Sequence, residues 1–483
     1  MATVMQITPR TGRWTELALL LPAVAIGVYG TWQVGLALDG QVPDYLLTYA
    51  LLLAGLGLAG HLVLRWRAPY ADPVLLPVVV ALNGIGLTMI TRVHITLNNR
   101  VNVPGWDVDP SRHMMWMVVG AVCGFAVLIL LRDHRTLRRY TWTSLVAGLV
   151  LLLLPLAPGI GREINGSRLW IGIGGFSFQP AELAKIAFAI FFAGYLVTHR
   201  DTLTLAGKKV LGLTLPRMRD LGPILLAWAL SIVVLLFQRE LGTSILLFGL
   251  FIAMLYVATE RLSWVIIGVL LSVGGVALVA MNVGYVEARF DVWLHALDPE
   301  VYNRSPGGSG QIVSGLFGMA GGGLFGTGWG EGYPTLTYSA NADMIVASLA
   351  EELGLTGIVA ILLLYLIMAQ RGLRIAIGVR DGFGKLLASG LAFVIALQVF
   401  IVVGGVTRVI PLSGLTMPFL AAGGSSLLAN WVIVALLMRI SDGARRPGVP
   451  EGVPATVPGA GPGQGVGGPG VATGPRAAAG DRA

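Results

Sequence analysis

The stretch SANADMIVASLAEELG, residues 339–354, lies where a polar connection turns into an apolar run, LTGIVAILLLYLIM at 355–368. The segment 344–369 is long enough to cross a bilayer, because a membrane-spanning helix needs about 20 apolar residues. It nevertheless carries Asp343 at its start and Glu351 and Glu352 two turns further in. Ionisable groups inside a membrane are costly and normally face a cavity or a partner. The stretch therefore predicts a membrane helix that presents carboxylates at one end.

The rest of the chain extends this prediction. The 483 residues are 55% hydrophobic and 12% charged, with a mean hydropathy of +0.77, which indicates an integral membrane protein. The segments lack the alternation of barrel strands, so we expect helices, in which backbone groups are satisfied internally. The fold class is therefore all-α and polytopic, with about 12 transmembrane helices at 15–37, 45–64, 73–91, 113–131, 143–160, 181–198, 221–237, 243–259, 263–283, 344–369, 383–406 and 417–438.

The distribution of Lys and Arg predicts the orientation. With the N-terminus inside, 21 of these residues fall on the cytoplasmic side and nine on the external side, as the positive-inside rule requires. Both termini are then cytoplasmic. The net charge of +8 marks this face and does not indicate a nucleic-acid partner. The single Cys123 and the six scattered His residues offer neither a disulfide framework nor a metal site.

Two segments stand apart from the helices. The connection 284–343 is long, acidic and rich in glycine, as in GMAGGGLFGTGWGEG, and long loops in compact folds are usually functional or disordered. We expect it to be a large extracytoplasmic loop. The segment 446–483 is rich in Pro, Gly and Ala and has little to bury, so we expect a disordered cytoplasmic tail.

Asp343 has two interpretations, as an acid at the positive end of a helix or as a functional group. Glu351 lies about 12 Å deeper at 1.5 Å per residue. At about 100° per residue Glu351 is about 80° round the helix from Asp343, and Glu352 about 180°. The two glutamates therefore differ in environment, and we expect one to pair with a basic residue of another helix.

Three further polar stretches interrupt the apolar pattern. GREINGSRLWIGIGGFSFQPAELAK, 161–185, is expected to form an external loop ahead of a helix on which Glu182 and Lys185 make either a simple intrahelical salt bridge or a functional network. FQRELGTS, 237–244, is a charged helix junction. TRVIPLSGLTMPFLAAGGSSLLAN, 407–430, is interrupted by Pro and Gly, as in broken helices whose backbone lines a cavity or is buried in protein. The chain has no phosphate loop, dinucleotide fingerprint or G-x-S-x-G elbow.

These stretches, with LDPE at 297–300 and the GGSGQ that follows, resemble the SEDS family (shape, elongation, division and sporulation proteins, including RodA, FtsW and SpoVE) over about 110–445. The two early spans and the connector RWRAPYADPVLLP look like the longer RodA-type members of actinobacteria. The resemblance implies a ten-helix core preceded by two extra helices. It divides the chain into a cytoplasmic N-terminus at 1–14, two N-terminal helices at 15–70, the membrane core at 71–445 and the tail at 446–483.

The resemblance implies a peptidoglycan glycosyltransferase of the bacterial plasma membrane. It would polymerise lipid II during elongation or division, together with a class B penicillin-binding protein. The position that matches the family's catalytic aspartate is Asp343. Independently, inverting transfer from a diphosphate needs a carboxylate base for the acceptor hydroxyl and positive charge at the leaving group. A divalent cation, Mg²⁺ or Mn²⁺, could share the second role, though the sequence shows no dedicated metal site.

The resemblance and the predicted topology together give two sets of site residues. The substrate-binding candidates are Arg162, Arg168, Lys185, Arg239, Arg289, Arg408, Trp116 and Gln311. The candidates for a structural network are Glu182, Glu240, Glu351, Glu352 and Ser425. For Trp116 a role in the interfacial aromatic belt is an equal alternative.

The chain departs from the family pattern next to the aspartate. Asn341, Ala342 and Met344 replace a polar pair and a Phe, Ala421-Ala422 replaces Ser-Tyr, and Leu412 or Ser413 occupies a position that is often Thr or Lys. These changes leave open a weakly active or partner-dependent enzyme. Two other classes also remain: a lipid II flippase or other transporter, which would place charges near the midplane in two repeats, and a scaffold, which would not need Asp343.

Overall fold

The computed structural model describes residues 11–99, 106–164, 167–173, 176–204, 209–210, 213–214, 222–305 and 307–447. The described residues up to Arg446 form one compact unit. Apart from its first two residues, the predicted disordered tail 446–483 lies outside the described residues, as do the first ten residues of the N-terminal segment 1–14.

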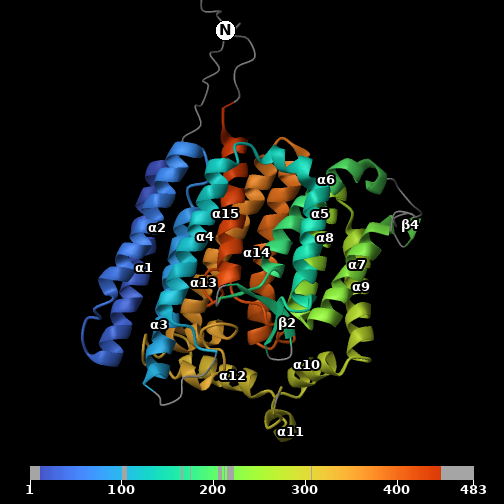
Figure 1. Cartoon of the computed structure of the whole chain (residues 1–483). Helices are drawn as coiled ribbons and strands as arrows, with labels where there is room; N and C mark the ends of the chain where they lie inside the picture. The colour runs from blue at the N-terminus through green and yellow to red at the C-terminus, as the bar shows by residue number, and fades with distance from the viewer. Residues whose placement is uncertain are drawn as a thin grey trace, which may run out of the picture. The chain divides into compact units, whose positions relative to one another are not determined.

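Helices dominate the described part of the chain (Figure 1). Within it, eleven segments are long and apolar enough to cross a membrane. They are α1 (Arg13–Asp39), α2 (Leu46–Arg67), α3 (Leu75–Asn98), α4 (Pro110–Leu130), η1-α5-η2 (His134–Tyr140, Thr141–Leu153, Leu154–Leu156), α6 (Ala181–Thr204), α8 (Leu241–Thr259), α9 (Leu262–Ala280), α13 (Ile345–Gly378), α14 (Gly382–Val406) and α15 (Gly424–Arg445). The shorter apolar helix α7 (Gly222–Gln238) occupies the predicted span 221–237. The prediction of a polytopic helical protein with about twelve helices is confirmed.

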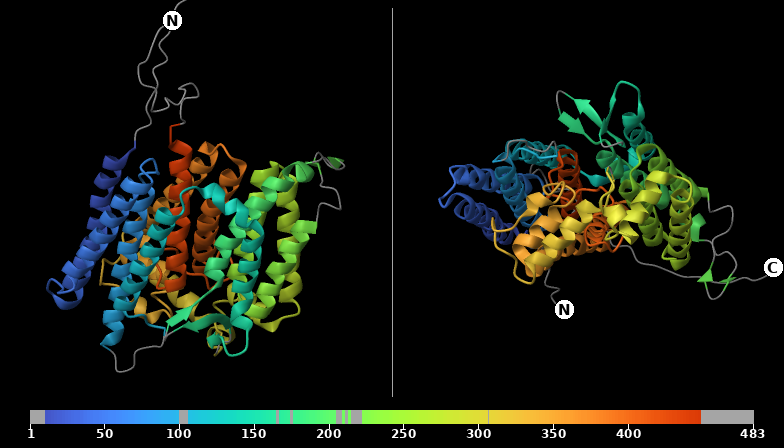
Figure 2. Two further views of the ribbon diagram at one scale, coloured as in Figure 1. Left: turned by 45° about the horizontal axis from the view of Figure 1, so that its top comes forward. Right: turned by 90° about the horizontal axis from the view of Figure 1, so that it is seen from below.

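The helices differ in how much of their surface other helices cover. The most apolar 18-residue window of α3 is entirely buried, whereas α1 and α2 bury only a third of theirs. α1 packs on α3 and α2. α1 and α2 lie at one edge of the bundle (Figure 2, left). They therefore cover α3 and leave their outer faces for lipid.

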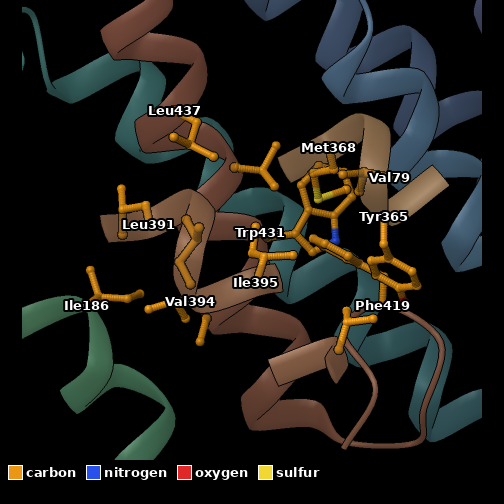
Figure 3. Packing of buried hydrophobic residues seen from close by; sticks show 14 of the residues in the cluster. Val79, Ile186, Tyr365, Met368, Leu391, Val394, Ile395, Phe419, Trp431 and Leu437 are labelled. Carbon is orange, nitrogen blue, oxygen red and sulfur yellow. The ribbon is translucent and has the colours of Figure 1, made fainter. Parts of the chain in front are cut away.

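The centre of the bundle is built around Trp431 of α15, which is almost fully buried (Figure 3). Its ring meets that of Phe419 edge to face, with centroids 6.3 Å apart, an arrangement that aromatic pairs prefer. The Tyr365 hydroxyl donates to the carbonyl of Pro418. These contacts from α13 and α15 fix the irregular segment that precedes α15.

The predicted start of the last membrane helix was wrong, because an irregular segment occupies its first residues. The predicted helix 417–438 begins only at Gly424. Phe419 has a φ of 64°, which is not helical, and the N-cap Gly423 is extended, so the helix does not extend upstream. The carbonyl of Thr416 instead accepts from Gln398 Nε2 at 2.9 Å. Side chains thus satisfy backbone that a helix would have satisfied itself.

The face predicted to be external carries short elements (Figure 1). The stretch 161–178, expected as a loop, forms an antiparallel sheet of β1 (Gly161–Ile164), β2 (Ser167–Ile173) and β3 (Phe176–Phe178), in the order β1-β2-β3. The predicted loop 284–343 contains α10 (Gly284–Leu294), α11 (Pro299–Tyr302), α12 (Gly310–Gly322) and the 3-10 turn η4 (Pro334–Leu336). At the opposite end of the bundle, on the face predicted to be cytoplasmic, β4 (Lys209–Val210) and β5 (Leu213–Thr214) form a second small sheet (Figure 1).

α13 is broken at Gly354, whose φ of 67° and ψ of −174° are not helical. The glycine-rich segment after α12 satisfies the backbone groups that the break releases. Thr327 N and Gly328 N donate to the carbonyls of Glu351 and Glu352, each at 3.0 Å. In return Leu355 N and Thr356 N donate to Gly323 O and Leu324 O, also at 3.0 Å. Irregular backbone in a membrane protein is tolerated where protein satisfies it in this way.

The segment after α12 is rich in glycine because its backbone lies very close to the backbone of α13 at the break. A Cβ on Gly354 would lie 2.2 Å from Gly326 N, and one on Gly326 would lie 2.2 Å from Glu352 O. Both glycines also have positive φ, a conformation that other residues rarely adopt. No larger residue fits at either position without moving the backbone.

The two glutamates of α13 hold the same segment through their side chains. Glu352 pairs with Arg92 of α3, with Nε and Oε1 2.8 Å apart and both side chains buried. Glu352 Oε2 accepts from Gly330 N at 3.0 Å, and Arg92 donates to Gly332 O at 2.7 Å. Glu351 accepts from Tyr333 N at 2.6 Å. Glu352 is thus the glutamate that pairs with a basic residue of another helix.

Two neighbouring glycines of α12 test this packing. A Cβ on Gly322 would lie 2.3 Å from Ala350 O, whereas one on Gly321 meets no atom within 4 Å. We predict that Gly322→Ala destabilises the protein by about 1–3 kcal/mol through overpacking. Gly321→Ala should be neutral or stabilise the helix by about 0.5–1 kcal/mol. Thermal unfolding of the purified variants, followed by tryptophan fluorescence, measures both. Equal stability of the two variants would show that the backbones do not meet here.

Candidate active site

Asp343 is held on a tight turn that leads into α13. Ala342 N and Met344 N both donate to Ser339 O, at 3.0 and 3.1 Å, and Ser339 itself has a φ of 57°. Ser348 Oγ, one turn inside the helix, donates to Ala340 O at 2.8 Å. The N-cap is Met344, so Asp343 is not the capping residue. Its half-buried carboxylate is therefore not used to start the helix.

The residues around Asp343 are anchored to three other parts of the chain. Asn341 Nδ2 donates to Asp107 Oδ1 at 3.1 Å, and Asp107 Oδ2 lies 2.6 Å from His94 Nδ1 at the end of α3. Asn341 O accepts from Ala422 N at 2.9 Å. Gln311 of α12 donates to Tyr338 O at 3.1 Å. The unusual Asn341 and Ala422 thus fix the position of the Asp343 turn, and Gln311 supports it from α12.

Arg289 of α10 supplies the positive charge that acts on Asp343. Its Nη1 donates to Leu412 O at 2.8 Å, and its guanidinium lies 5.3 Å from the centre of the Tyr285 ring. Desolvation raises the pKa of Asp343 to about 6, and the charge of Arg289 limits this increase. The carboxylate is therefore close to its titration point at neutral pH, as suits a general base.

Glu240, between α7 and α8, is the second carboxylate that Arg289 influences. Burial raises the pKa of Glu240 to about 7, an effect that the nearby Glu182 increases and Arg289 opposes. Gln179 Nε2 donates to both Glu240 oxygens, at 3.3 and 3.2 Å, and Gln179 N donates to Ser425 Oγ at 2.8 Å. The junction 237–244 is thereby tied to the start of α15.

Lys185 and Glu182 form a buried ion pair within α6, with Nζ and Oε2 2.5 Å apart. Lys185 Nζ also donates to Gln398 Oε1 of α14 at 2.8 Å, and Gln398 in turn donates to Thr416 O. The pair is therefore part of a network between helices rather than a simple exposed salt bridge. In this position Lys185 supports the broken segment before α15.

The remaining candidates have other contacts. Arg168 pairs with Glu163 of the external sheet at 3.1 Å, and both are exposed. Arg162 is exposed in β1, with its guanidinium over Gly172. Arg408 donates to the carbonyls of Trp293 and Leu294, at 2.6 and 2.8 Å, and so holds the end of α10. Arg239 is exposed at the α7–α8 junction with a φ of 56°. Trp116 is half-buried, with its ring against Gly424.

Several site residues were not among the sequence candidates, namely Asp107, His94, Gln179, Tyr285 and Gln398. Asp107, Gln179 and Gln398 contact partners from distant parts of the chain, so no local spacing revealed them. His94 contacts Asp107 across the α3–α4 connection, and Tyr285 contacts Arg289 one turn along α10. Gln179 alone had a signal, because it directly precedes Pro180 at the start of α6. Among the described residues, no group of three His, Cys, Asp or Glu side chains forms a candidate metal site.

Comparisons with known proteins identify the family and support the fold. A family model described as "Cell cycle protein", for FtsW, RodA and SpoVE, matches residues 73–446. "Peptidoglycan glycosyltransferase RodA" of Mycobacterium tuberculosis is 48% identical over 441 residues, which cover 90% of this chain and 92% of that protein. The protein of the same name from Mycobacterium leprae is 46% identical over 447 residues, covering 92% and 94%. A chain from a solved peptidoglycan synthase complex superimposes with a TM-score of 0.59 at 24% identity, covering 77% of this chain and 98% of that one, which supports the fold.

Proposed function

This chain belongs to the FtsW, RodA and SpoVE family and is a multi-pass membrane peptidoglycan glycosyltransferase, and we propose that it polymerises lipid II with Asp343 as the general base. The observation that carries this proposal is the half-buried Asp343 carboxylate, whose pKa is raised to about 6 and whose nearby charge is Arg289. We infer that the protein acts at the external face of a bacterial plasma membrane. As the family resemblance implies, its proposed partner is a class B penicillin-binding protein.

In the proposed reaction the acceptor sugar's 4-hydroxyl attacks C1 of the donor sugar. Asp343 takes the hydroxyl proton while the new C–O bond forms. The bond from C1 to the diphosphate breaks at the same time, and the lipid diphosphate leaves with the electron pair. A single displacement inverts the configuration at C1, which converts an α-linked diphosphate into a β-1,4 bond.

Arg289 is the residue that we propose to bind and stabilise the departing diphosphate. Its charge acts on both Asp343 and Glu240, and its bond to Leu412 O fixes the guanidinium beside the 411–414 turn. Fixed positive charge stabilises a leaving group that becomes more negative in the transition state. Arg168 is paired with the Glu163 carboxylate, which offsets its charge, so it is less suited to this role. Arg408 uses both Nε and Nη2 to hold carbonyls of α10, whereas the bond from Arg289 to Leu412 O uses Nη1 and leaves Nη2 and Nε for a ligand.

The supporting network then has a positioning role. Glu240 and Gln179 tie the α7–α8 junction to Ser425, and Lys185 and Gln398 hold the segment before α15. These residues connect α6, the start of α8, α14 and the start of α15. A reacting carboxylate and its cation need fixed positions, because a small displacement of catalytic groups costs much of the rate.

Replacement of the proposed base tests the function. Asp343→Asn keeps the shape of the side chain but removes the proton acceptor, so lipid II polymerisation should fall by about 10²- to 10⁴-fold. The assay measures glycan strands made by the purified protein, alone and with its class B partner. Asp291→Asn is the matched control, because Asp291 is a half-buried acid of α10 that is neutralised by Arg304. It should retain near wild-type activity. Unchanged polymerisation by Asp343→Asn would contradict the assignment.

The acid limb of the pH profile gives a second prediction. Below its pKa of about 6, Asp343 is protonated and cannot accept a proton, so kcat/KM should rise with pH through about 6 and then level off. Glu240, with a pKa of about 7, is the group most easily confused with it. In Glu240→Gln the limb near pH 6 should persist, whatever the change in maximal rate. Loss of that limb in Glu240→Gln would assign the titration to Glu240 instead.

A further inference from the structure

A second polar site lies on the face that the Lys and Arg distribution predicts to be cytoplasmic. A cavity of about 260 Å³ is lined by Arg135, Arg138, Arg380, Asp381, Gly382 and Phe383. Its walls come from η1, ahead of α5, from the connection between α13 and α14, and from the first two residues of α14. Arginines that are far apart in the sequence therefore face one hollow, which the positive-inside tendency alone does not require.

The charges in this cavity are unbalanced. The single carboxylate, Asp381, already accepts from Gly384 N at 2.7 Å and lies 2.9 Å from Nε2 of the buried His134. Arg135 Nε is a further 3.4 Å contact of the same carboxylate. Across the part of the chain that the structure describes, no carboxylate lies within ion-pair distance of Arg138 or Arg380. Two guanidinium groups are thus available to an anion, and arginine binds phosphate oxygens in a bidentate manner.

The neighbouring aromatic side chains place the cavity at the level of lipid headgroups. Tyr140 is the last residue of η1 and Trp142 lies at the start of α5, and the two are 44% and 63% exposed. Tyr and Trp gather at both membrane interfaces, where an apolar ring and a polar group are both accommodated. Arg139 lies over the Tyr140 ring at 5.3 Å. A ligand in the adjacent cavity would therefore meet the bilayer surface rather than open solvent.

The size of the cavity limits what it can hold. It falls below the range of about 300–1,000 Å³ that is usual for sites that enclose a whole small molecule. A single phosphate group with its first substituent suits it better, with the rest of the ligand outside. We propose that this cavity binds the phosphate of an anionic lipid in the adjacent leaflet. Because η1 packs against α6, α14 and α15, the bound lipid would link the start of α5 to the α13–α14 connection.

Lipid retention by the full-length protein tests this site. The purified protein is reconstituted in nanodiscs of phosphatidylcholine with phosphatidylglycerol, and bound lipid is measured by native mass spectrometry after release. Arg138→Gln/Arg380→Gln should weaken phosphatidylglycerol binding by about 100-fold, since each replaced arginine loses a direct charge-assisted contact to the phosphate that is worth roughly a factor of ten. The matched control is Arg132→Gln/Arg374→Gln, which removes the same charge from exposed arginines that do not line the cavity. The control should retain the lipid.

A second arm separates a lipid from a soluble phosphate. Inorganic phosphate and glycerol phosphate are titrated against the protein in nanodiscs of phosphatidylcholine alone, with phosphatidylglycerol in a parallel titration. The proposal expects binding of the lipid and little binding of either soluble anion. Equal loss of lipid from the cavity variant and the control, or binding of the soluble anions without the lipid, would overturn it. Thermal unfolding of both double variants shows whether any loss of lipid reflects misfolding.

Discussion

Four backbone hydrogen bonds between the glycine-rich segment and the break in α13 are the constraint on which the external face depends. A helix interrupted at Gly354 leaves carbonyl and amide groups without intrahelical partners, and a membrane protein must satisfy them from within. The segment 323–328 does so only because Gly326 and Gly354 have no side chains to separate the two backbones. The break turns the first part of α13 into a short, separately anchored helix that carries Asp343 just before its start.

The electrostatics of the site follow from this anchoring. Glu352 and Arg92 neutralise one another in the core and fasten the glycine-rich loop to α3, so neither is available for chemistry. Asp343 instead lies half-buried at the end of the anchored helix, with Arg289 from α10 as the charge that limits its pKa. Since Arg289 also bonds Leu412 O and acts on Glu240, one guanidinium links the external loop, the 411–414 turn and the α7–α8 junction. The proposed base, Asp343, and the proposed diphosphate-binding residue, Arg289, thus interact electrostatically.

Hydropathy and charge predicted the membrane helices well, because a bilayer imposes length and composition on each span independently of tertiary contacts. They could not predict that Glu352 pairs with Arg92, since 260 residues separate the two. The start of α15 at Gly424, the strands at 161–178 and the break at Gly354 also depend on packing partners that no local pattern encodes. For Asp343 the family motif supplied the prediction, and its role as the base stays a proposal. The choice among the external arginines needed the structure, which places Arg168 beside Glu163, Arg408 on the carbonyls of α10 and Arg289 near the proposed base.

The most direct test of this account is the pH dependence of lipid II polymerisation in Arg289→Gln and Arg289→Lys. Removing the positive charge raises the pKa of Asp343 further, so the acid limb of kcat/KM should move to higher pH in Arg289→Gln. The lysine variant keeps the charge, and its limb should stay close to that of the wild type even if the rate falls. An acid limb that does not move in Arg289→Gln, or that moves equally in both variants, would contradict the electrostatic link between Arg289 and Asp343.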